Sequence, residues 1–367
     1  MTAVTGLTRV LSVVGARPNF VKLAAVAHAL RRRADVDHIV VHTGQHYDSA
    51  MSGSFFGDLD IAPPTTNLEV GSDTHAKQTA AAMQRLEPVL ERVAPDWVLV
   101  YGDVNSTVAA ALVAVKLGLK VAHVEAGLRS RDRTMPEEHN RVVTDHLADL
   151  LFAPSRDAII TLRAEGIAAD RIAFVGNVMI DTLIRLRPAA RALGTARRLG
   201  LDEGGYVLVT LHRPGNVDDP DVLRALCEAL AGLARTRPVV FPAHPRTRAR
   251  LEAPGLAHRL GGVRLLDPVP YLEMLDLTES AALVLTDSGG VQEETTFLGI
   301  PCLTVRPNTE RPVTVTEGSN QLVNATPEAI LAAASNGVRR HVTQIERWDG
   351  RAGERIVAVL CDGARFA

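Results

Sequence analysis

The sequence has 367 residues, 46% of them hydrophobic, and its 40 basic residues nearly balance its 42 acidic ones. That length favours two domains, and the near-zero net charge argues against nucleic acid or a membrane surface as the main partner. The three cysteines, Cys227, Cys302 and Cys361, are too few and too scattered for a disulfide framework or a thiolate metal site. We find no signal-peptide pattern and no apolar run of the ~20 residues that span a bilayer, so we expect a soluble, cytoplasmic protein.

Strand-like and helix-like segments alternate along the first half of the chain. The expected strands are residues 9–14, 37–42, 97–101, 121–125, 150–154 and 172–175. The expected helices are residues 18–32, 75–93 (with a kink or break near Pro88), 106–116, 137–147 and 157–165. This alternation predicts a mostly parallel sheet with helices on both faces.

The alternation begins again after a helix at 178–193 and a polar stretch at 194–205. The further strands are expected at 206–210, 239–241, 263–266, 282–286, 302–304 and 321–323. We therefore expect an α/β protein of two doubly wound, Rossmann-like domains facing a cleft. Residues 1–177 form the first domain, 178–350 the second, and 351–367 a C-terminal helix that packs back on the first.

Ligands of such sheets bind beyond the carboxyl ends of the strands, and chemically useful side chains gather there. In the second half, a strand that ends at Thr286 leads through Ser288, Gly289 and Gly290 into a helix. Free N–H groups and the helix dipole make such a turn an anion site, and Glu294 could accept hydrogen bonds from ribose hydroxyls. The alternative is an ordinary tight turn between a strand and a helix.

In the first half, three acids follow expected strands: Asp103, Glu125 and Glu137. Asp103 could be a helix N-cap. Glu137 could lie at a helix start simply because the helix dipole stabilises an acid there. Glu125 closes an apolar run, where a carboxylate without a partner is costly. Because all three lie at the carboxyl ends of one sheet, we predict an acid/base function.

Cationic side chains occupy the matching positions. Arg17 and Lys22 follow the first strand and could reach one diphosphate, or form a surface pair. His212 follows the first strand of the second half and suits a departing phosphate or a proton shuttle. His244 and Arg311 follow two later strands and complete an anion-binding rim.

Other chemistries find little support. The dinucleotide fingerprint GxGxxG and the nucleophile elbow GxSxG are both missing. The acids of residues 35–37 suit a solvated turn, and the pairs His123 with Glu125 and His139 with His146 lack further ligands. We therefore expect neither a metal nor a cofactor.

Nine motifs in order, over roughly residues 9–324, resemble the bacterial, non-hydrolysing UDP-N-acetylglucosamine 2-epimerases. They are GARPNFVK, TGQHYD, GDVNST, HVEAGLRS, MPEEHNR, VGNVMIDTL, VTLHRPGNVD, DSGGVQEE and PCLTVRPNTERP. The resemblance implies a glycosyltransferase-B-like fold, a homodimer, and UDP-GlcNAc or UDP in the cleft. It also implies C2 inversion to UDP-ManNAc by anti elimination of UDP to 2-acetamidoglucal and re-addition.

By motif match, the resemblance implies a role for each candidate residue. The catalytic set is Asp103, Glu125, Glu137 and His212, and the UDP contacts are Arg17, Lys22, Ser288, Gly289, Gly290 and Glu294. Gln45 and His46 match part of an activator site known in some members, but residues 71–75 lack its basic partner. Two further departures are Asn19, where the best-known members have Glu, and Met274, where an aromatic residue is frequent.

Three alternatives remain at this point. A hydrolysing epimerase would release ManNAc and UDP, a glycosyltransferase of the same fold would need an acceptor, and a UDP-sugar sensor would not turn over. The C2 hydrogen of a sugar is not acidic, so its removal requires advanced C1–O cleavage and carboxylates that stabilise the oxocarbenium charge. Two acid/base groups are needed, one for each face of the sugar, and the sequence does not assign them.

Overall fold

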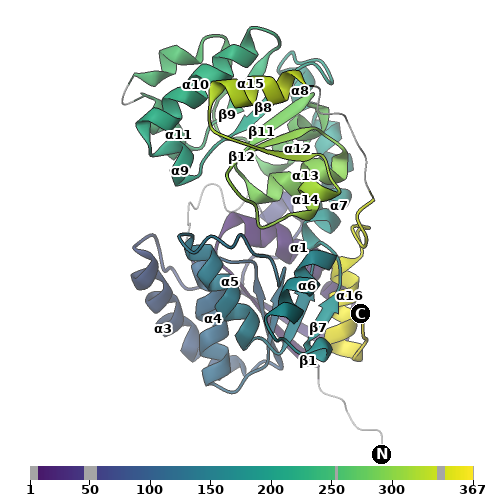
Figure 1. The fold of residues 1–367 in the computed structure, drawn as a ribbon. Coiled ribbons are helices and arrows are strands. Elements are labelled where there is room, and N and C mark those ends of the chain that lie inside the picture. The colour runs from purple at the N-terminus through teal and green to yellow at the C-terminus, as the bar shows by residue number, and fades with distance from the viewer. Residues whose placement is uncertain (1–6, 45–55, 253–254, 337–343, 367) are drawn as a thin grey trace, which may run out of the picture. The chain divides into compact units, whose positions relative to one another are not determined.

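A computed structural model describes residues 7–44, 56–252, 255–336 and 344–366 of the chain. The chain divides into two compact units (Figure 1): unit 1 is Met1–Thr182 with Glu346–Ala367, and unit 2 is Leu183–Ile345. Each unit is built on a parallel sheet with helices on its faces. The expected fold class, α/β with two doubly wound sheets, is therefore confirmed.

Within the described residues, the sheet of unit 1 has the strand order β3-β2-β1-β4-β5-β6-β7, and all its pairs are parallel. The strands are β1 (Thr8–Val14), β2 (Val36–His42), β3 (Thr66–Asn67), β4 (Trp97–Tyr101), β5 (Val121–Val124), β6 (Leu150–Ala153) and β7 (Ile172–Phe174). The strand order reverses between β1 and β4, and ligands of doubly wound sheets bind at such a switch point.

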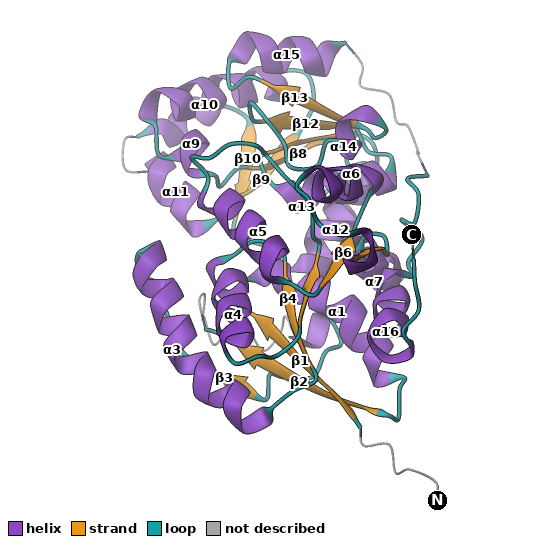
Figure 2. Cartoon of the chain, turned by 60° about the horizontal axis from the view of Figure 1, so that its bottom comes forward, coloured by secondary structure: helices purple, strands orange, loops and turns teal. Residues whose placement is uncertain are grey.

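Helices cover both faces of this sheet. They are α1 (Arg17–Arg31), α3 (His75–Val93), α4 (Asn105–Lys116), α5 (Pro136–Leu147), α6 (Arg156–Ala164), η1 (Ala169–Arg171) and α16 (Ala352–Asp362). Helix α7 (Val178–Leu193) begins in unit 1 and continues into unit 2, since the division falls after Thr182. Figure 2 shows α3 and α4 on one side of the strands and α1 and α16 on the other. The central strand β1 is buried from Val10 to Val14 and is apolar there except for Ser12, as a strand covered on both faces requires.

The C-terminal segment is held on unit 1 by specific contacts. The indole N–H of buried Trp348 donates to the Pro154 carbonyl at 3.1 Å, and the Phe174 N–H donates to the Phe366 carbonyl at 2.8 Å. A β-carbon on Gly353 would lie 2.5 Å from the Ala25 carbonyl oxygen. Only glycine therefore allows α16 to approach α1 so closely.

Unit 2 repeats the pattern with the strand order β10-β9-β8-β11-β12-β13, again with parallel pairs. Its strands are β8 (Val207–Thr210), β9 (Val239–Pro242), β10 (Val263–Leu266), β11 (Leu283–Thr286), β12 (Cys302–Val305) and β13 (Asn320–Val323). Its helices are α8 (Thr195–Arg198), α9 (Pro214–Val217), α10 (Pro220–Ala234), α11 (Pro245–Glu252), η2 (Leu256–Leu260), α12 (Tyr271–Ser280), α13 (Gly289–Leu298), α14 (Val313–Thr316) and α15 (Pro327–Ser335). The switch point lies between β8 and β11.

Alternate residues of β8 enter two different cores. Val207 and Val209 pack in the core formed with α10 and α15, whereas Leu208 packs with α8 and α12 on the opposite face. A central strand that is apolar on both sides is typical of a doubly wound sheet. The carboxyl end of β8 is thereby fixed in position.

Two details differ from the sequence-based expectation. Helix α3 is not broken at Pro88 but continues through it from His75 to Val93. The two-residue strand β3 is too short to give a periodic signal. Among the described residues, no helix is long and apolar enough to cross a membrane.

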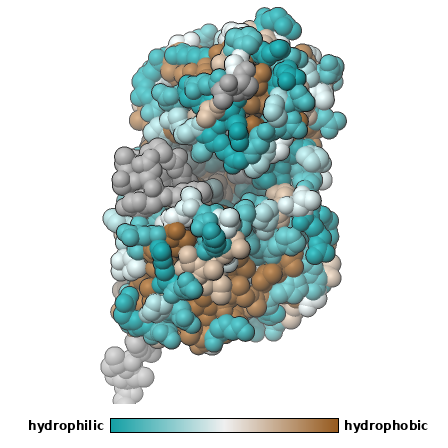
Figure 3. Space-filling view, turned by 90° about the vertical axis from the view of Figure 1, so that its left-hand side faces the viewer, coloured by the Kyte–Doolittle hydropathy of each residue, from teal (hydrophilic) through white to brown (hydrophobic). Residues whose placement is uncertain are grey.

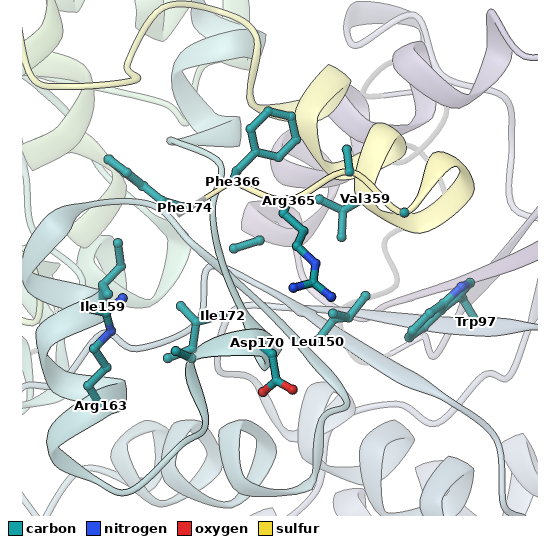
Figure 4. A pocket seen from close by; sticks show the side chains of 14 residues that line it. Trp97, Leu150, Ile159, Arg163, Asp170, Ile172, Phe174, Val359, Arg365 and Phe366 are labelled. Carbon is teal, nitrogen blue, oxygen red and sulfur yellow. The ribbon is translucent and has the colours of Figure 1, made fainter.

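A cavity of about 540 Å³ in unit 1 lies at the amino ends of the strands (Figure 4). Trp97, Leu150 and Ile172, each the first residue of its strand, line it together with Arg365 and Phe366. The carboxyl ends, where ligands of doubly wound sheets bind, are at the opposite edge. This cavity is therefore distinct from the candidate site described next.

Candidate functional site

Asp103 follows β4 and is held by an arginine of α5. Its carboxylate forms an ion pair with the buried Arg141, and the Asn140 side chain donates to the Asp103 carbonyl at 2.9 Å. The N-cap of α4 is Val104, with no side-chain capping bond. Asp103 therefore lies one residue before the N-cap of α4 and is held in an ion pair with Arg141.

Glu125 occupies an unusual backbone conformation directly after β5. Its φ is 71°, in the left-handed region that costs a non-glycine residue on the order of 1 kcal/mol. The carboxylate is buried and paired with the ammonium group of Lys22, which is itself 5% exposed. A partner thus compensates the buried charge, as the sequence required.

Glu137 and Glu138 have different surroundings although they are neighbours in the first turn of α5. Glu138 is buried, accepts the Ser130 and Arg131 N–H groups at 2.9 and 2.8 Å, and pairs with Arg141. Burial alone would raise the pKa of Glu138, but these hydrogen bonds and Arg141 outweigh it and lower the pKa. Glu137 is half-buried, and its carboxylate has no partner among the described residues, which leaves it available to a substrate.

The first turn of unit 1 depends on Asn19. Its side-chain oxygen accepts the N–H groups of Gly15 and Ala16 at 3.2 Å, and its amide group donates to the Tyr101 carbonyl at 2.8 Å. A glutamate could not donate in this way, so the departure at this position links the carboxyl ends of β1 and β4. Arg17 is the first residue of α1, and its side chain lies outside the described part of the structure.

In unit 2, the start of α13 has the features of an anion site. Ser288 is the N-cap and makes no side-chain capping bond, and within the described residues nothing accepts from the Gly289 and Gly290 N–H groups. A β-carbon on Gly289 would lie 2.8 Å from Glu310 Oε1 and would also strike the Arg311 guanidinium. The Gly289 backbone is not in the left-handed region, so glycine is favoured there by close packing rather than by the turn.

A buried ionic cluster surrounds this turn. Arg311 pairs with Glu310 and, at 3.1 Å, with Glu293, while Arg306 lies 2.8 Å from Glu310. Arg213 contributes a third guanidinium, 3.7 Å from Glu310. Three arginines face Glu293, Glu310 and the nearby Asp287 carboxylate, so their charges roughly cancel. The feature that favours an anion here is the pair of free N–H groups at the start of α13.

His212 follows β8 and is oriented by a residue that the sequence did not single out. Its Nδ1 lies 3.1 Å from the carboxylate of Asp287, which follows β11 and is fully buried. Asp287 also accepts the backbone N–H groups of His212 and Arg213 at about 3 Å. The opposite nitrogen of the half-exposed imidazole therefore remains for a ligand. A carboxylate at the end of an apolar strand is the signal that could have identified Asp287.

Glu294 is buried on α13 and accepts a hydrogen bond from the Tyr271 hydroxyl at 2.9 Å. Burial raises the pKa of Glu294 to about 7; the Tyr271 hydrogen bond opposes this rise and the nearby Glu293 adds to it. His244 is exposed after β9, and its Nδ1 accepts the Arg246 N–H at 3.3 Å. Its place at the carboxyl edge of the same sheet agrees with the expected rim.

Some expected features lie elsewhere or cannot be placed. Gln45 and His46 are outside the described residues. His139 and His146 bond to different backbone carbonyls, those of Arg133 and Val142. Across the described segments, no three His, Cys, Asp or Glu residues come together in a metal-binding group.

Two parallel doubly wound sheets, one carrying acids and the other an anion-binding helix start, define the glycosyltransferase-B-like class. A UDP-glucosyltransferase from Polygonum tinctorium shares this fold, with a TM-score of 0.61 at 14% identity over 98% of this chain and 99% of its own. The sequence profile of the UDP-N-acetylglucosamine 2-epimerase family matches residues 28–361. The chain belongs to this family of isomerase-type enzymes.

Individual relatives agree with the assignment. A UDP-GlcNAc 2-epimerase structure from Methanocaldococcus jannaschii, in complex with UDP-GlcNAc and UDP, has a TM-score of 0.90 at 40% identity and covers 97% of this chain and 100% of its own. The Neisseria meningitidis structure bound to UDP-GlcNAc has a TM-score of 0.88 at 30% identity, covering 96% and 100%. A Pseudomonas aeruginosa UDP-2,3-diacetamido-2,3-dideoxy-D-glucuronate 2-epimerase is 42% identical over 96% of this chain and 99% of its own.

Proposed function

We propose that the chain is a non-hydrolysing epimerase that interconverts UDP-GlcNAc and UDP-ManNAc. UDP leaves by anti elimination, with loss of the C2 proton, to give 2-acetamidoglucal, and UDP then adds back as a proton returns to the other face of C2. The carboxylates of unit 1 carry out the proton transfers, and unit 2 holds the UDP.

The observation that carries this proposal is the pairing of acids at the carboxyl edge of the unit 1 sheet. Asp103 and Glu125 follow adjacent strands, and each has its own cation, Arg141 or Lys22. Two separately held carboxylates supply the two acid/base groups that proton transfer on both faces of a sugar requires. Glu137 adds an unpartnered third acid within the described residues.

In unit 2, the parts needed to stabilise a leaving diphosphate belong to one switch point. The free N–H groups at Gly289 and Gly290 suit phosphate oxygens, and His212, oriented by Asp287, suits the oxygen that departs from C1. Glu294 is assigned to the ribose hydroxyls, Ser288 and Arg311 to the phosphates, and His244 to the rim. Arg17 and Lys22 are assigned to the diphosphate from unit 1.

The test separates this function from hydrolysis. Purified protein is incubated with UDP-GlcNAc and the products are resolved by anion exchange and proton NMR. UDP-ManNAc in equilibrium with UDP-GlcNAc is the expected result. Free ManNAc with stoichiometric UDP would identify a hydrolysing enzyme, and absence of turnover would identify a sensor.

A second candidate substrate is favoured by one comparison. Because a 42% identical relative is named for UDP-2,3-diacetamido-2,3-dideoxy-D-glucuronate, that sugar nucleotide must be assayed in parallel. We expect UDP-GlcNAc to have the higher kcat/KM by about tenfold or more. The reverse ratio would be compatible with epimerisation at C2 but would identify the diacetamido-dideoxy-glucuronate nucleotide as the preferred substrate.

The proposal includes a cytoplasmic homodimer. Val115 on α4 and Val143 on α5 are 37% and 39% exposed, and Figure 3 shows apolar side chains grouped on the surface of unit 1. These features support association through unit 1. Light scattering coupled to size exclusion should give twice the 39.4 kDa chain mass, and a monomer at micromolar concentration would contradict it.

A further inference from the structure

Unit 1 contains a buried ionic network that the chemistry described so far does not use. It runs from Glu165 through Arg129 and Asp145 to His123 on β5. Arg129 bridges the two carboxylates, with contacts of 2.7 Å to each, and His123 and Asp145 are completely buried. Charged groups are rarely placed so deep without a structural or functional reason.

The ionic network ends at a backbone carbonyl in the turn that carries Asp103. His123 Nδ1 lies 2.6 Å from Asp145 Oδ1, and Nε2 lies 2.7 Å from the carbonyl oxygen of Gly102. A carbonyl oxygen can only accept, so Nε2 must carry a hydrogen. Asp145 Oδ2 already accepts from the Gly127 N–H at 3.0 Å and from Arg129, which marks Asp145 as an ionised acceptor.

With Nε2 as the donor, the imidazole joins the Gly102 carbonyl to the ionised Asp145. The low pKa of Asp145 agrees: burial would raise it, but the contacts with His123 and Arg129 outweigh burial and lower it. A hydrogen bond in the low-dielectric interior of a protein is electrostatically stronger than one in water. The bond to the Gly102 carbonyl is thus suited to holding a turn in place.

That turn needs to be held, because its geometry leaves little space. Gly102 has a φ of 63°, and a β-carbon there would lie 2.5 Å from Lys22 Nζ and 3.1 Å from Glu125 Oε2. Its N–H donates to the Val124 carbonyl at 3.0 Å, and its carbonyl accepts from His123. Both backbone groups of Gly102 are therefore tied to β5, directly before Asp103 on one strand and Glu125 on the other.

We propose that His123, backed by Asp145 and Arg129, is a positioning residue that fixes Asp103 relative to Glu125 for proton transfer at C2. It touches no substrate atom and acts through the Gly102 carbonyl. The inference rests on the proposed epimerase function. Displacing a catalytic group by about 1 Å can cost on the order of 100-fold in rate, so loss of this single bond should be visible in kcat.

The experiment uses two substitutions at one position, each retaining a different half of the ring. Asparagine places its amide near the Nδ1 position and can still bond to Asp145, but it cannot reach Gly102. Glutamine can place an N–H donor near the Nε2 position. We expect His123→Asn to lower kcat by about 10- to 100-fold with KM and the UDP Kd little changed, and His123→Gln to recover most of the loss.

His28→Asn is the matched control, because His28 Nε2 also lies 3.2 Å from a backbone carbonyl, that of Leu59. His28 is in the last turn of α1 and is not one of the proposed site residues. It should leave kcat unchanged. A proton-coupled ¹⁵N spectrum of ring-labelled wild-type protein at pH 7 adds a readout that does not depend on folding of a variant. The Nε2 of His123 should carry a hydrogen.

Three results would overturn the inference: wild-type kcat in His123→Asn, parallel losses of kcat and UDP affinity that glutamine does not recover, or an Nε2 without a hydrogen. Wild-type turnover with an unaffected His123→Asn would refute the inference alone. A wild-type protein that does not epimerise any UDP-sugar would refute the proposed function, and the inference with it.

Discussion

Single carboxylates in this protein owe their character to the groups that face them. Asp103, Glu125 and Glu138 each have a cationic partner, whereas Glu137 has none among the described residues. The same side-chain chemistry can therefore serve catalysis at one position and stability at the next. Substitutions that keep the shape and remove the charge separate the two uses.

Glu125→Gln should leave the UDP Kd near the wild-type value and lower kcat by about 100-fold or more, because a proton-transfer group is lost while the nucleotide contacts remain. Calorimetry with UDP and a steady-state assay measure the two effects. A variant with wild-type kcat would remove Glu125 from the catalytic set.

The neighbours on α5 should respond in opposite ways. Glu137→Gln should lower kcat by about tenfold or more without changing the melting temperature, because Glu137 makes no described contact. Glu138→Gln should destabilise the fold by about 1–3 kcal/mol, because it weakens buried bonds to Ser130, Arg131 and Arg141. Thermal melts beside initial rates distinguish them, and the reverse pattern would exchange their roles.

Glu294 predicts a pH dependence of UDP binding. Its pKa of about 7 means that the carboxylate, the better acceptor for ribose hydroxyls, forms as pH rises from 6 to 8. The UDP Kd of the wild type should therefore fall over this range more than that of Glu294→Gln. Equal pH profiles for the two proteins would show that Glu294 does not contact the ribose.

Over the same pH range in which UDP binding improves, the stability of the folded protein should decrease. The folded protein keeps the Glu294 proton between the ordinary value of 4.5 and about 7, whereas the unfolded chain releases it. The free energy of unfolding therefore decreases as pH rises through this window. Glu294→Gln retains the acceptor for Tyr271 and removes the buried charge, so it should be at least as stable as the wild type at pH 8.

At the scale of elements, the candidate site residues lie where a strand ends and a helix begins. β8 and β11 bring His212 and the start of α13 to one switch point, and β1 and β4 bring Asn19 and Asp103 to the other. The strand order of a doubly wound sheet explains why residues so distant in sequence converge.

Gly289→Ala tests the start of α13. The added methyl group would meet the buried Glu310 and Arg311, whose mutual ion pair resists displacement. We expect UDP affinity to fall about tenfold or more and stability to fall by about 1–3 kcal/mol. Gly57→Ala, where an added β-carbon meets nothing within 4 Å, should change neither. Unchanged UDP affinity in Gly289→Ala would exclude this turn from the nucleotide site.

Most elements could be predicted from the sequence because apolar runs and helical segments alternate strongly. The strand at 97–101 and the helix at 178–193 begin and end where expected. β3 could not be predicted, since two residues carry no period. The continuation of α3 through Pro88 could not be predicted either, because proline disfavours a helix interior and the buried Leu86, Val89 and Leu90 hold this stretch against the core by tertiary packing.

The candidate acids could be identified from their positions after strands, but their partners could not. Arg141 and Asp287 act through contacts between segments that are far apart in the chain, such as Arg141 with Asp103 and Asp287 with His212. Lys22, expected at a diphosphate, lies against Glu125. Pairing of this kind depends on tertiary structure and leaves no local pattern.

At the scale of the whole molecule, two similar sheets divide the work. Unit 1 contains the acids with their cations, and unit 2 contains the start of α13 with its buried arginine–carboxylate cluster. Each unit can therefore be tested separately. Substitution of Asp103, Glu125 or Glu137 should change kcat, and substitution at the start of α13 should change the UDP Kd.

The central claim is that the enzyme removes and returns the C2 proton of a UDP-sugar without an acceptor. The most direct measurement is proton NMR of UDP-GlcNAc incubated with the protein in D2O. Deuterium should replace the C2 hydrogen in both UDP-GlcNAc and UDP-ManNAc, with Glu125→Gln slowed by about 100-fold. UDP-ManNAc that kept its C2 hydrogen, or no exchange into either sugar, would contradict the account.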